Sequence, residues 1–318
     1  MAYNIDPELA PIIDLVPELS IEDPVAAREG FEAMVAAMNA EVDATGVIVE
    51  NFTVPGPENA PDVPVRLYRP EGATDTTGAL LHIHGGGFVI GSLDSEMGSC
   101  LALCRELGTP ILSVDYRLAP ETPFPGGLED CYASLVWLAE NAGSYSIDPA
   151  RIAVMGMSAG GGLAAATALL AKERGGPALC FQYLGIPELD DRLETPSMQA
   201  FVDTPMWNSR AAVYSWDFYL GDAYTRASSE VPVLAAPARA EIDELKGLPP
   251  AYVSTMEFDP LRDEGIFYAL KLMQAGVATE LHSFPGTFHG SAMVPTAEVS
   301  QRENTELIAV LRRALSSQ

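Results

Sequence analysis

The chain has 318 residues, of which 48% are apolar and 19% charged, a composition typical of a compact globular protein and not of a disordered one. Its 44 acidic residues outnumber the 18 basic ones, and the net charge of −26 at pH 7 would repel phosphate backbones and anionic lipid. We therefore expect no nucleic-acid partner and no membrane partner.

The first twenty residues have neither the basic segment nor the continuous apolar run of a secretory signal. No apolar stretch of the sequence approaches the roughly 18 residues that span a bilayer. Cys100 and Cys104 lie one turn apart in a predicted helix, and with Cys131 and Cys180 they lack the spacing of a metal site. We interpret the cysteines as reduced, and the sequence predicts a cytoplasmic protein.

From about residue 46 the sequence alternates between strand-like and helix-like segments. Strands are predicted, in chain order, at 47–54, 63–70, 78–85, 110–118, 151–155, 180–186, 251–258 and 280–284. Helices are predicted at 95–107, 127–142, 162–174, 264–276 and 303–316. Apolar strands that alternate with helices predict an α/β protein with a mostly parallel sheet covered on both faces.

Two segments do not follow this alternation. Residues 1–45 have a helical pattern but precede the first strand, and residues 190–245 are irregular and rich in aromatic side chains. A long insertion between the strands of an α/β sheet is usually a lid or a binding element. The sequence leaves open whether its aromatic residues form a small core or line a hydrophobic pocket. These residues are Trp207, Tyr214, Trp216 and Phe218.

Ser158 lies where a predicted strand meets a predicted helix, within the sequence GMSAG at 156–160. The pattern G-x-S-x-G at such a junction is typical of a catalytic serine on a sharp turn, where flanking glycines avoid Cβ clashes. The N-terminus of the following helix directs free N–H groups toward charge that develops on a reacting oxygen. The pattern therefore favours Ser158 as a nucleophile.

Two other interpretations use the same glycines. Gly160, Gly162 and Ala165 match the pattern G-x-G-x-x-A of a dinucleotide-binding oxidoreductase, although the acidic residue expected about 20 positions later is poorly placed. The glycines could also serve only the close packing of the helix on the strand.

A second glycine-rich stretch, LHIHGGGF at 81–88, ends a predicted strand. Three successive glycines let the backbone turn so that two N–H groups point at one spot, as an oxyanion hole requires. His82 and His84 share one face of the strand, as two ligands of a metal ion would. No cluster of cysteines or carboxylates supports a metal site here. We interpret His84 as a structural residue that braces the glycine loop.

A serine nucleophile needs a base. His282 lies inside a predicted strand, where a structural role is the default, whereas His289 lies in a glycine-bounded loop after that strand. The base of an α/β hydrolase lies on a loop past the last strand, so we predict that His289 is the base.

The base in turn needs an acid that orients it. Asp259 leaves the end of the strand predicted at 251–258 and is followed by Pro260. Asp263 begins a helical pattern and is explained as an N-cap, and Glu257 is a weaker candidate. We predict that Asp259 is the acid, which gives the chain order serine, aspartate, histidine of the α/β hydrolases.

The sequence resembles the hormone-sensitive-lipase-like esterases over roughly residues 60–315. The matching motifs are HGGGF at 84–88, DYRLAPE at 115–121, GMSAGGGLA at 156–164, DPLRDEG at 259–265 and FHG at 288–290. The resemblance implies an α/β-hydrolase core with a mainly helical cap. The implied division is an N-terminal part of the cap at 1–45, the first part of the core at 46–189, a cap insertion at 190–245 and the second part of the core at 246–318.

The resemblance also implies roles for individual residues. Ser158, Asp259 and His289 would form a catalytic triad, and Gly86, Gly87 and Ala159 would supply the N–H groups of the oxyanion hole. Family members hydrolyse short-to-medium acyl esters of small molecules without a metal or an organic cofactor. Many of them form dimers, so a homodimer is among the expectations.

Three matters stay open at this point. Amidase, thioesterase or lactonase activity could use the same residues, and a ligand-binding protein on the same scaffold is a further alternative. Position 157 holds Met where the family commonly has Asp or Thr, which leaves the subgroup open. We interpret the charged motif of Asp115, Tyr116, Arg117 and Glu121 as structural, with a buried pair of Asp and Arg that braces a loop.

Overall fold

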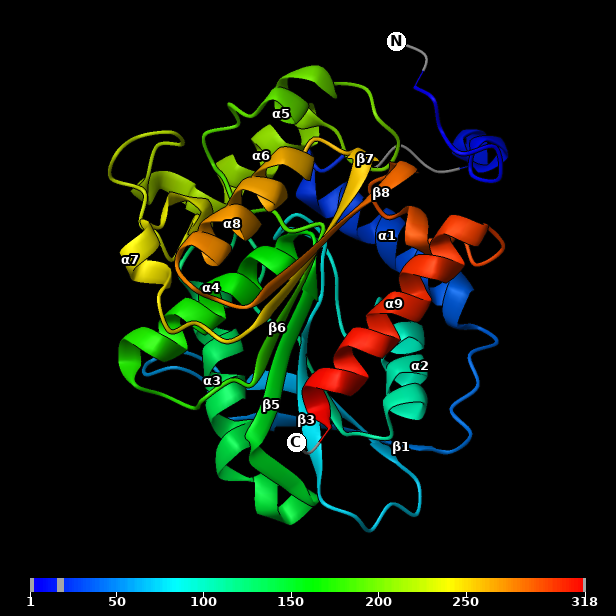
Figure 1. Cartoon of the computed structure of the whole chain (residues 1–318), viewed down its shortest axis with the longest axis vertical. Helices are drawn as coiled ribbons and strands as arrows, with labels where there is room; N and C mark the ends of the chain where they lie inside the picture. The colour runs from blue at the N-terminus through cyan, green and yellow to red at the C-terminus, as the bar shows by residue number, and fades with distance from the viewer. Residues whose placement is uncertain (1–2, 16–19, 317–318) are drawn as a thin grey trace.

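The computed structural model describes residues 3–15 and 20–316, and these form one eight-stranded sheet in the order β1-β2-β4-β3-β5-β6-β7-β8 (Figure 1). The strands are Val47–Val54 (β1), Val63–Pro70 (β2), Thr77–Ile83 (β3), Ile111–Val114 (β4), Ile147–Met157 (β5), Phe181–Gly185 (β6), Ala251–Phe258 (β7) and Thr279–Phe288 (β8). β2 pairs antiparallel with β1 and with β4, and the other neighbouring pairs are parallel. The prediction of a mostly parallel sheet is confirmed.

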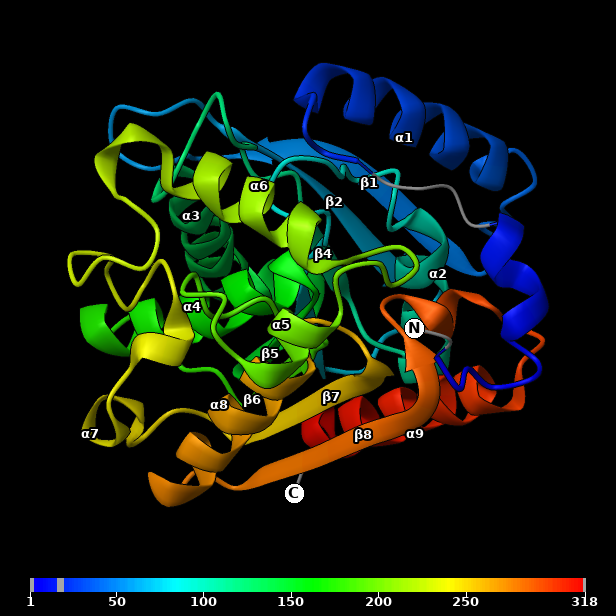
Figure 2. The same ribbon diagram turned by 90° about the horizontal axis from the view of Figure 1, so that it is seen from above.

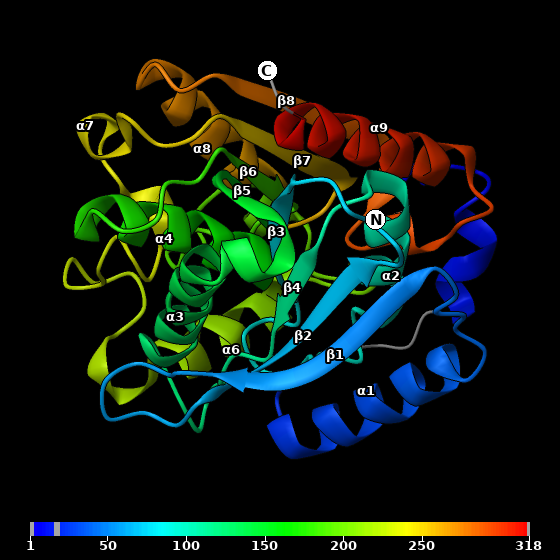
Figure 3. The ribbon, with the colours of Figure 1, turned by 90° about the horizontal axis from the view of Figure 1, so that it is seen from below.

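Five long helices cover the two faces of the sheet (Figure 3). Met97–Leu107 (α2) and Glu298–Leu315 (α9) lie on one face. The other face carries Gly126–Glu140 (α3), Ala159–Arg174 (α4) and Arg262–Gln274 (α8). Side chains of the central strands alternate between the two layers: in β5, Ala153 and Met155 pack with α2 and α9, whereas Ile152 and Val154 pack with α3 and α4.

Several helices lie over one end of the sheet (Figure 2). They are Pro24–Asn39 (α1), Pro196–Ala200 (α5) and Ser209–Leu220 (α6), and the short Ile242–Leu245 (α7) follows at the side of the sheet. Asp23 caps α1 by accepting hydrogen bonds from the N–H groups of Val25 and Ala26. These helices come from the two segments that we predicted to form a cap. No helix among residues 3–15 and 20–316 has both the length and the apolar character to cross a membrane.

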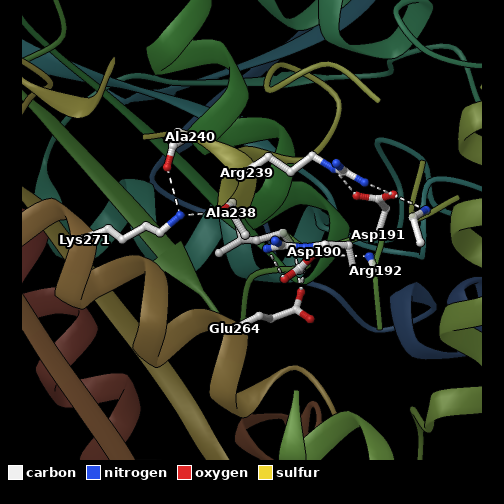
Figure 4. Close-up of polar contacts among 10 residues, drawn as sticks. Asp190, Asp191, Arg192, Ala238, Arg239, Ala240, Glu264 and Lys271 are labelled. Atoms are coloured by element: carbon white, nitrogen blue, oxygen red, sulfur yellow. Dashed lines mark hydrogen bonds and ion pairs between the residues drawn. The ribbon is translucent and has the colours of Figure 1, made fainter. Parts of the chain in front are cut away.

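Polar contacts fasten the chain after β6 to α8 (Figure 4). Glu264 of α8 accepts hydrogen bonds from two backbone N–H groups just past β6. Lys271, two turns further along α8, donates to two carbonyls of the 238–240 turn at 2.8 and 2.9 Å. Arg239 of that turn pairs with the fully buried Asp191 at 2.6 Å. The 190–245 insertion is thus fixed at both ends to the helix that follows β7.

The boundaries differ from the sequence prediction at two places that matter for the site. β4 ends at Val114, four residues before the predicted end, because the chain turns away into the motif that begins at Asp115. β8 continues to Phe288, beyond the predicted end at 284, through its parallel pairing with β7. His289 therefore follows the strand directly.

Candidate active site

Ser158 lies between the end of β5 and the beginning of α4. Its backbone angles, φ 58° and ψ −125°, are a strained combination for a residue with a side chain. Gly156 lets the turn close, because a Cβ there would lie 2.0 Å from the carbonyl oxygen of Gly160. The N–H of Ser158 donates to the carbonyl of Gly185 at 2.8 Å, which fixes the turn to β6.

The glycines at the start of α4 also permit close packing. A Cβ on Gly160 would lie 2.2 Å from the carbonyl oxygen of Ile83, and one on Gly162 would lie 2.1 Å from that of Glu188. The sharp turn and the close packing, which we had weighed as alternatives, are both present. Together they account for these glycines without a bound dinucleotide.

His289 contacts both Ser158 and Asp259. Its Nε2 lies 3.0 Å from Ser158 Oγ, and its Nδ1 lies 2.7 Å from Asp259 Oδ2. Asp259 is fully buried, and its other oxygen accepts the N–H of Leu261 at 2.9 Å. Because a carboxylate only accepts, the contact with Asp259 places the imidazole proton on Nδ1 and leaves Nε2 free to accept the serine proton. Parallel β7 and β8 bring the acid and the base together, since each residue directly follows its strand.

Asp263 and Glu257, the other two candidates for the acid that orients the base, make different contacts. Asp263 accepts the N–H of Ser197 at 2.7 Å. Its interpretation as an N-cap is wrong, because α8 begins one residue earlier and its N-cap position is Leu261. Glu257 accepts the N–H of Gly286 at 2.7 Å, which supports the bend of β8 before His289.

The remaining histidines lie away from Ser158 Oγ. His282 is bound through Nδ1 to Glu306, 2.9 Å away. His84 Nδ1 lies 2.7 Å from the carbonyl oxygen of Gly85, and its ring stacks on Tyr116 with centroids 4.1 Å apart. Burial lowers the pKa of His84 to about 4, so its ring is neutral at pH 7. These contacts agree with the interpretation of His84 as a brace for the glycine loop.

The glycine loop adopts conformations that favour glycine. Gly86 has φ +114° and Gly87 has φ +55°, and the carbonyl of Gly86 accepts the N–H groups of Val89 and Ile90 at 3.0 Å. The N–H groups of Gly86 and Gly87 have no acceptor in the part of the chain that the structure describes. Ala159 is the first residue of α4, so its N–H has no acceptor within the helix. The three N–H groups are available to an anion.

Ser215 of α6 supports this loop from the other side. Its Oγ donates to the carbonyl of Gly87 at 3.0 Å. The sequence does not indicate this role of Ser215, because 128 positions separate the two partners and no local pattern marks the contact.

The charged motif after β4 is structural, but its pairing was predicted wrongly. Arg117 does not pair with Asp115. Two of its nitrogens lie 2.8 Å from the carboxylate oxygens of the buried Asp130, on α3. Glu121 accepts hydrogen bonds from Arg28 of α1 at 2.7 and 2.9 Å, so the motif holds α1 in place.

A cavity of about 650 Å³ opens at Ser158 and His289. Trp207 lines it, whereas Trp216 is fully buried against Phe88, with ring centroids 5.6 Å apart. Trp216 thus belongs to a buried core and Trp207 to the lining of the cavity. Among the described residues, no group of three or more His, Cys, Asp or Glu side chains lies close enough to hold a metal ion.

The chain is similar to known proteins over most of its length. Residues 80–293 match a family described as having the alpha/beta hydrolase fold. The carboxylesterase NlhH of Mycobacterium tuberculosis is 36% identical, over 98% of this chain and 97% of its own. A solved bacterial heroin esterase is 50% identical with a TM-score of 0.96 and covers 99% of both chains. A hyperthermophilic esterase from the archaeon Pyrobaculum calidifontis is 32% identical with a TM-score of 0.86, over 97% of this chain and 98% of its own.

Proposed function

The chain belongs to the α/β-hydrolase family, in its hormone-sensitive-lipase-like branch, and is a carboxylesterase; on this premise we propose that Ser158 cleaves esters through an acyl-enzyme intermediate. His289 is the general base and general acid of the proposal, and Asp259 orients it. Gly86, Gly87 and Ala159 provide the N–H groups that stabilise the oxyanion.

The position of His289 between Ser158 and Asp259 is the observation that carries the proposal. The contact with Ser158, at 3.0 Å, lies within the range that proton transfer requires, and the contact with Asp259, at 2.7 Å, is a hydrogen bond that fixes the ring. All three side chains are at least nine-tenths buried, so little water competes for their hydrogen bonds. The buried carboxylate stabilises the imidazolium that forms when His289 accepts a proton.

In the first half-reaction Ser158 Oγ attacks the ester carbonyl carbon while His289 Nε2 takes the hydroxyl proton. The electron pair of the carbonyl moves to its oxygen, and each N–H donor to that oxygen contributes about 10²–10³ in rate. When the carbonyl re-forms, the bond to the alcohol oxygen breaks, and His289 gives its proton to the leaving alcohol. The acyl group stays on Ser158.

In the second half-reaction a water molecule takes the place of the alcohol. His289 removes one of its protons as the water oxygen bonds to the acyl carbon. Collapse of this second intermediate breaks the bond to Ser158 Oγ, which recovers its proton from His289, and the carboxylic acid leaves.

The size of the cavity supports the proposal that short-to-medium acyl esters are substrates, because there is room for a ligand beyond the reacting carbonyl. The similarity to a heroin esterase adds esters of bulky or aromatic alcohols as candidates.

The test is hydrolysis of p-nitrophenyl esters, from acetate to longer acyl chains, by the wild type and by Ser158→Ala. We expect kcat to fall on the order of 10⁶-fold in the variant. Ser144→Ala, an exposed serine outside the site, is the matched control and keeps the wild-type rate. Equal rates in the wild type and Ser158→Ala would contradict the proposal, and the absence of turnover in both would favour a ligand-binding protein.

A further inference from the structure

The cavity at Ser158 extends along the face of the sheet that α2 and α9 cover. Its floor is formed by side chains of β3 and β5, and its walls by apolar residues of the two helices. The floor residues are His82, Met155 and Met157, and the walls include Leu103, Leu307 and Ile308. One arm of a bound ester would therefore lie between the sheet and these helices.

Two ionisable side chains interrupt this apolar lining. Glu96, at the start of α2, and His82, on β3, both line the cavity, and His82 Nε2 lies 3.8 Å from Glu96 Oε2. His82 is only 1% exposed, and its Nδ1 has no hydrogen-bond partner among the described residues. The two groups are too far apart for a good hydrogen bond with each other, so a third group placed between or beside them could bind both.

Glu96 has no structural task that would explain its position. It occupies the N-cap position of α2, yet its side chain makes no capping hydrogen bond. Its side chain is 21% exposed, and partial burial raises its pKa to about 7, so its charged form has lost part of its hydration and gains from a hydrogen-bond donor. Burial lowers the pKa of His82 to about 4, so its ring is neutral at pH 7.

Some other polar residues of the lining already have partners. Ser95 donates through Oγ to the carbonyl of Ser92, and the amide nitrogen of Asn304 donates to the carbonyl of Ala292. Glu106 has most of its side chain exposed. Glu96 lines the same cavity with a carboxyl group that accepts no hydrogen bond from the described residues.

The sheet register gives the distance from Ser158. His82 pairs with Met155, three residues before Ser158 on β5. At about 3.3 Å per residue, the backbone of His82 lies about 10 Å along the strand from Ser158, and Glu96 lies beside His82. An extended chain advances about 1.1–1.2 Å per bond, so an arm of about eight bonds would reach Glu96.

We propose that the cavity selects esters in which one arm ends, about eight bonds from the carbonyl, in a hydroxyl or amino group that donates a hydrogen bond to Glu96. This proposal rests on the esterase function and names the substrate class of the same site. His82 completes the polar end of the cavity beside Glu96, and the apolar walls bind the methylene chain. Esters with a plain alkyl arm would leave the Glu96 carboxyl without a partner.

The test compares kcat/KM for methyl octanoate, methyl 8-hydroxyoctanoate and methyl 8-aminooctanoate, and for hexyl acetate against 6-hydroxyhexyl acetate. In both hydroxylated esters the terminal oxygen lies eight bonds from the carbonyl carbon, so the two sets tell the acyl arm from the alcohol arm. We expect the wild type to prefer the hydroxylated ester of one pair by roughly three- to tenfold. Glu96→Leu abolishes this preference. Glu96→Gln retains it for the hydroxyl group but loses any preference for the amine, because an amide accepts a hydrogen bond without charge.

Each ratio compares kcat/KM for two esters in the same variant. A change in the amount of folded enzyme or in its overall activity therefore cancels, and only a change in selectivity remains. Glu173→Gln, an exposed acid on α4, is the matched control and keeps the wild-type ratios. Identical ratios in the wild type and Glu96→Leu for both pairs of esters would overturn the proposal. Ser158→Ala tests the esterase mechanism independently, because it abolishes turnover of every ester whatever the ratios are.

Discussion

The indole ring of Trp207 lies directly against the backbone of Gly87. A Cβ on this glycine would be 2.5 Å from a carbon of the ring, and its φ of +55° is unfavourable for any other residue. The insertion thus packs onto the loop that carries the proposed oxyanion-hole donors.

We predict that Gly87→Ala lowers kcat by about 10²–10³ with a smaller effect on KM, because the new methyl group must displace the loop and misalign its N–H groups. Steady-state kinetics with p-nitrophenyl acetate would measure the effect. Gly143→Ala is the control, since Gly143 is exposed and a Cβ there meets nothing within 4 Å. A Gly87→Ala enzyme with wild-type kcat would rule out this loop as the oxyanion hole.

The hydrogen bond from Ser215 to the carbonyl of Gly87 gives a second prediction. Ser215→Ala leaves that buried carbonyl without its partner, which costs about 1–3 kcal/mol of unfolding free energy and lets the loop move. Ser134→Ala removes a buried hydroxyl bonded to the carbonyl of Asp130 within α3, but that carbonyl keeps its helical N–H partner. We expect denaturant unfolding to show a clear loss of stability, and kinetics a lower kcat, only for Ser215→Ala. Equal kcat values in the two variants would mean that Ser215 is structural alone.

Asp259→Asn should lower kcat by about 10⁴ while the fold is retained. An amide can present its N–H to Nδ1 of His289 and so favour the tautomer that cannot accept the proton of Ser158. The comparison variant is Asp263→Asn, four residues later, whose native carboxylate accepts from Ser197 instead. If Asp263→Asn lost the larger share of kcat, the assignment of the acid would be wrong.

The fold and the central residues of the site could be predicted because their signals are local. Ser158 is marked by five neighbouring residues, and the triple glycine by the end of an apolar strand. His289 and Asp259 were predicted from their places just after two strands, since parallel strands place their carboxyl ends at one edge of the sheet. Each of these inferences needs only a short stretch of sequence and a general rule of topology.

Contacts between distant segments could not be predicted in this way. The partner of Arg117 is Asp130, on the next helix, and not the neighbouring Asp115, because the packing of α3 decides which carboxylate it meets. Ser215 and Glu96 carried no pattern at all. Their relevance depends on how α6 lies on the glycine loop and how α2 lies on β3, which only the packed structure shows.

The pair of Arg239 and Asp191 leads to a prediction on stability. Asp191 is fully buried, and its carboxylate accepts from Arg239 and from the N–H of Ala227. Arg239→Ala leaves a buried carboxylate without its counter-charge, which we expect to cost about 3–5 kcal/mol of unfolding free energy. Lys246→Ala is the control, because Lys246 and Asp243 form an exposed pair, and its unfolding curve should match that of the wild type. Coincident urea unfolding curves for Arg239→Ala and the wild type would refute the prediction.

The buried carboxyl group of Glu303 leads to a prediction of how the stability of the protein depends on pH. Glu303 is a buried residue of α9, and its carboxyl has no hydrogen-bond partner among the described residues. Burial, with a smaller contribution from Glu306, raises its pKa to about 8. In the unfolded chain the pKa is near the usual 4.5, so the folded protein holds an additional proton between these values. The stability that this group contributes is fully present below pH 4.5 and is lost as the pH rises through 8.

Glu303→Gln mimics the protonated acid at every pH. Its Tm should therefore equal that of the wild type near pH 4.5 and exceed it increasingly up to pH 8. The exposed Glu298→Gln, on the same helix, is the control and should change Tm little and by the same amount across this range. The neighbouring groups Tyr183, Tyr252, His282 and Glu306 are retained in both variants, so their own titration cancels in the comparison. Parallel curves of Tm against pH for Glu303→Gln and the wild type would show that Glu303 ionises as easily in the folded protein as in the unfolded chain.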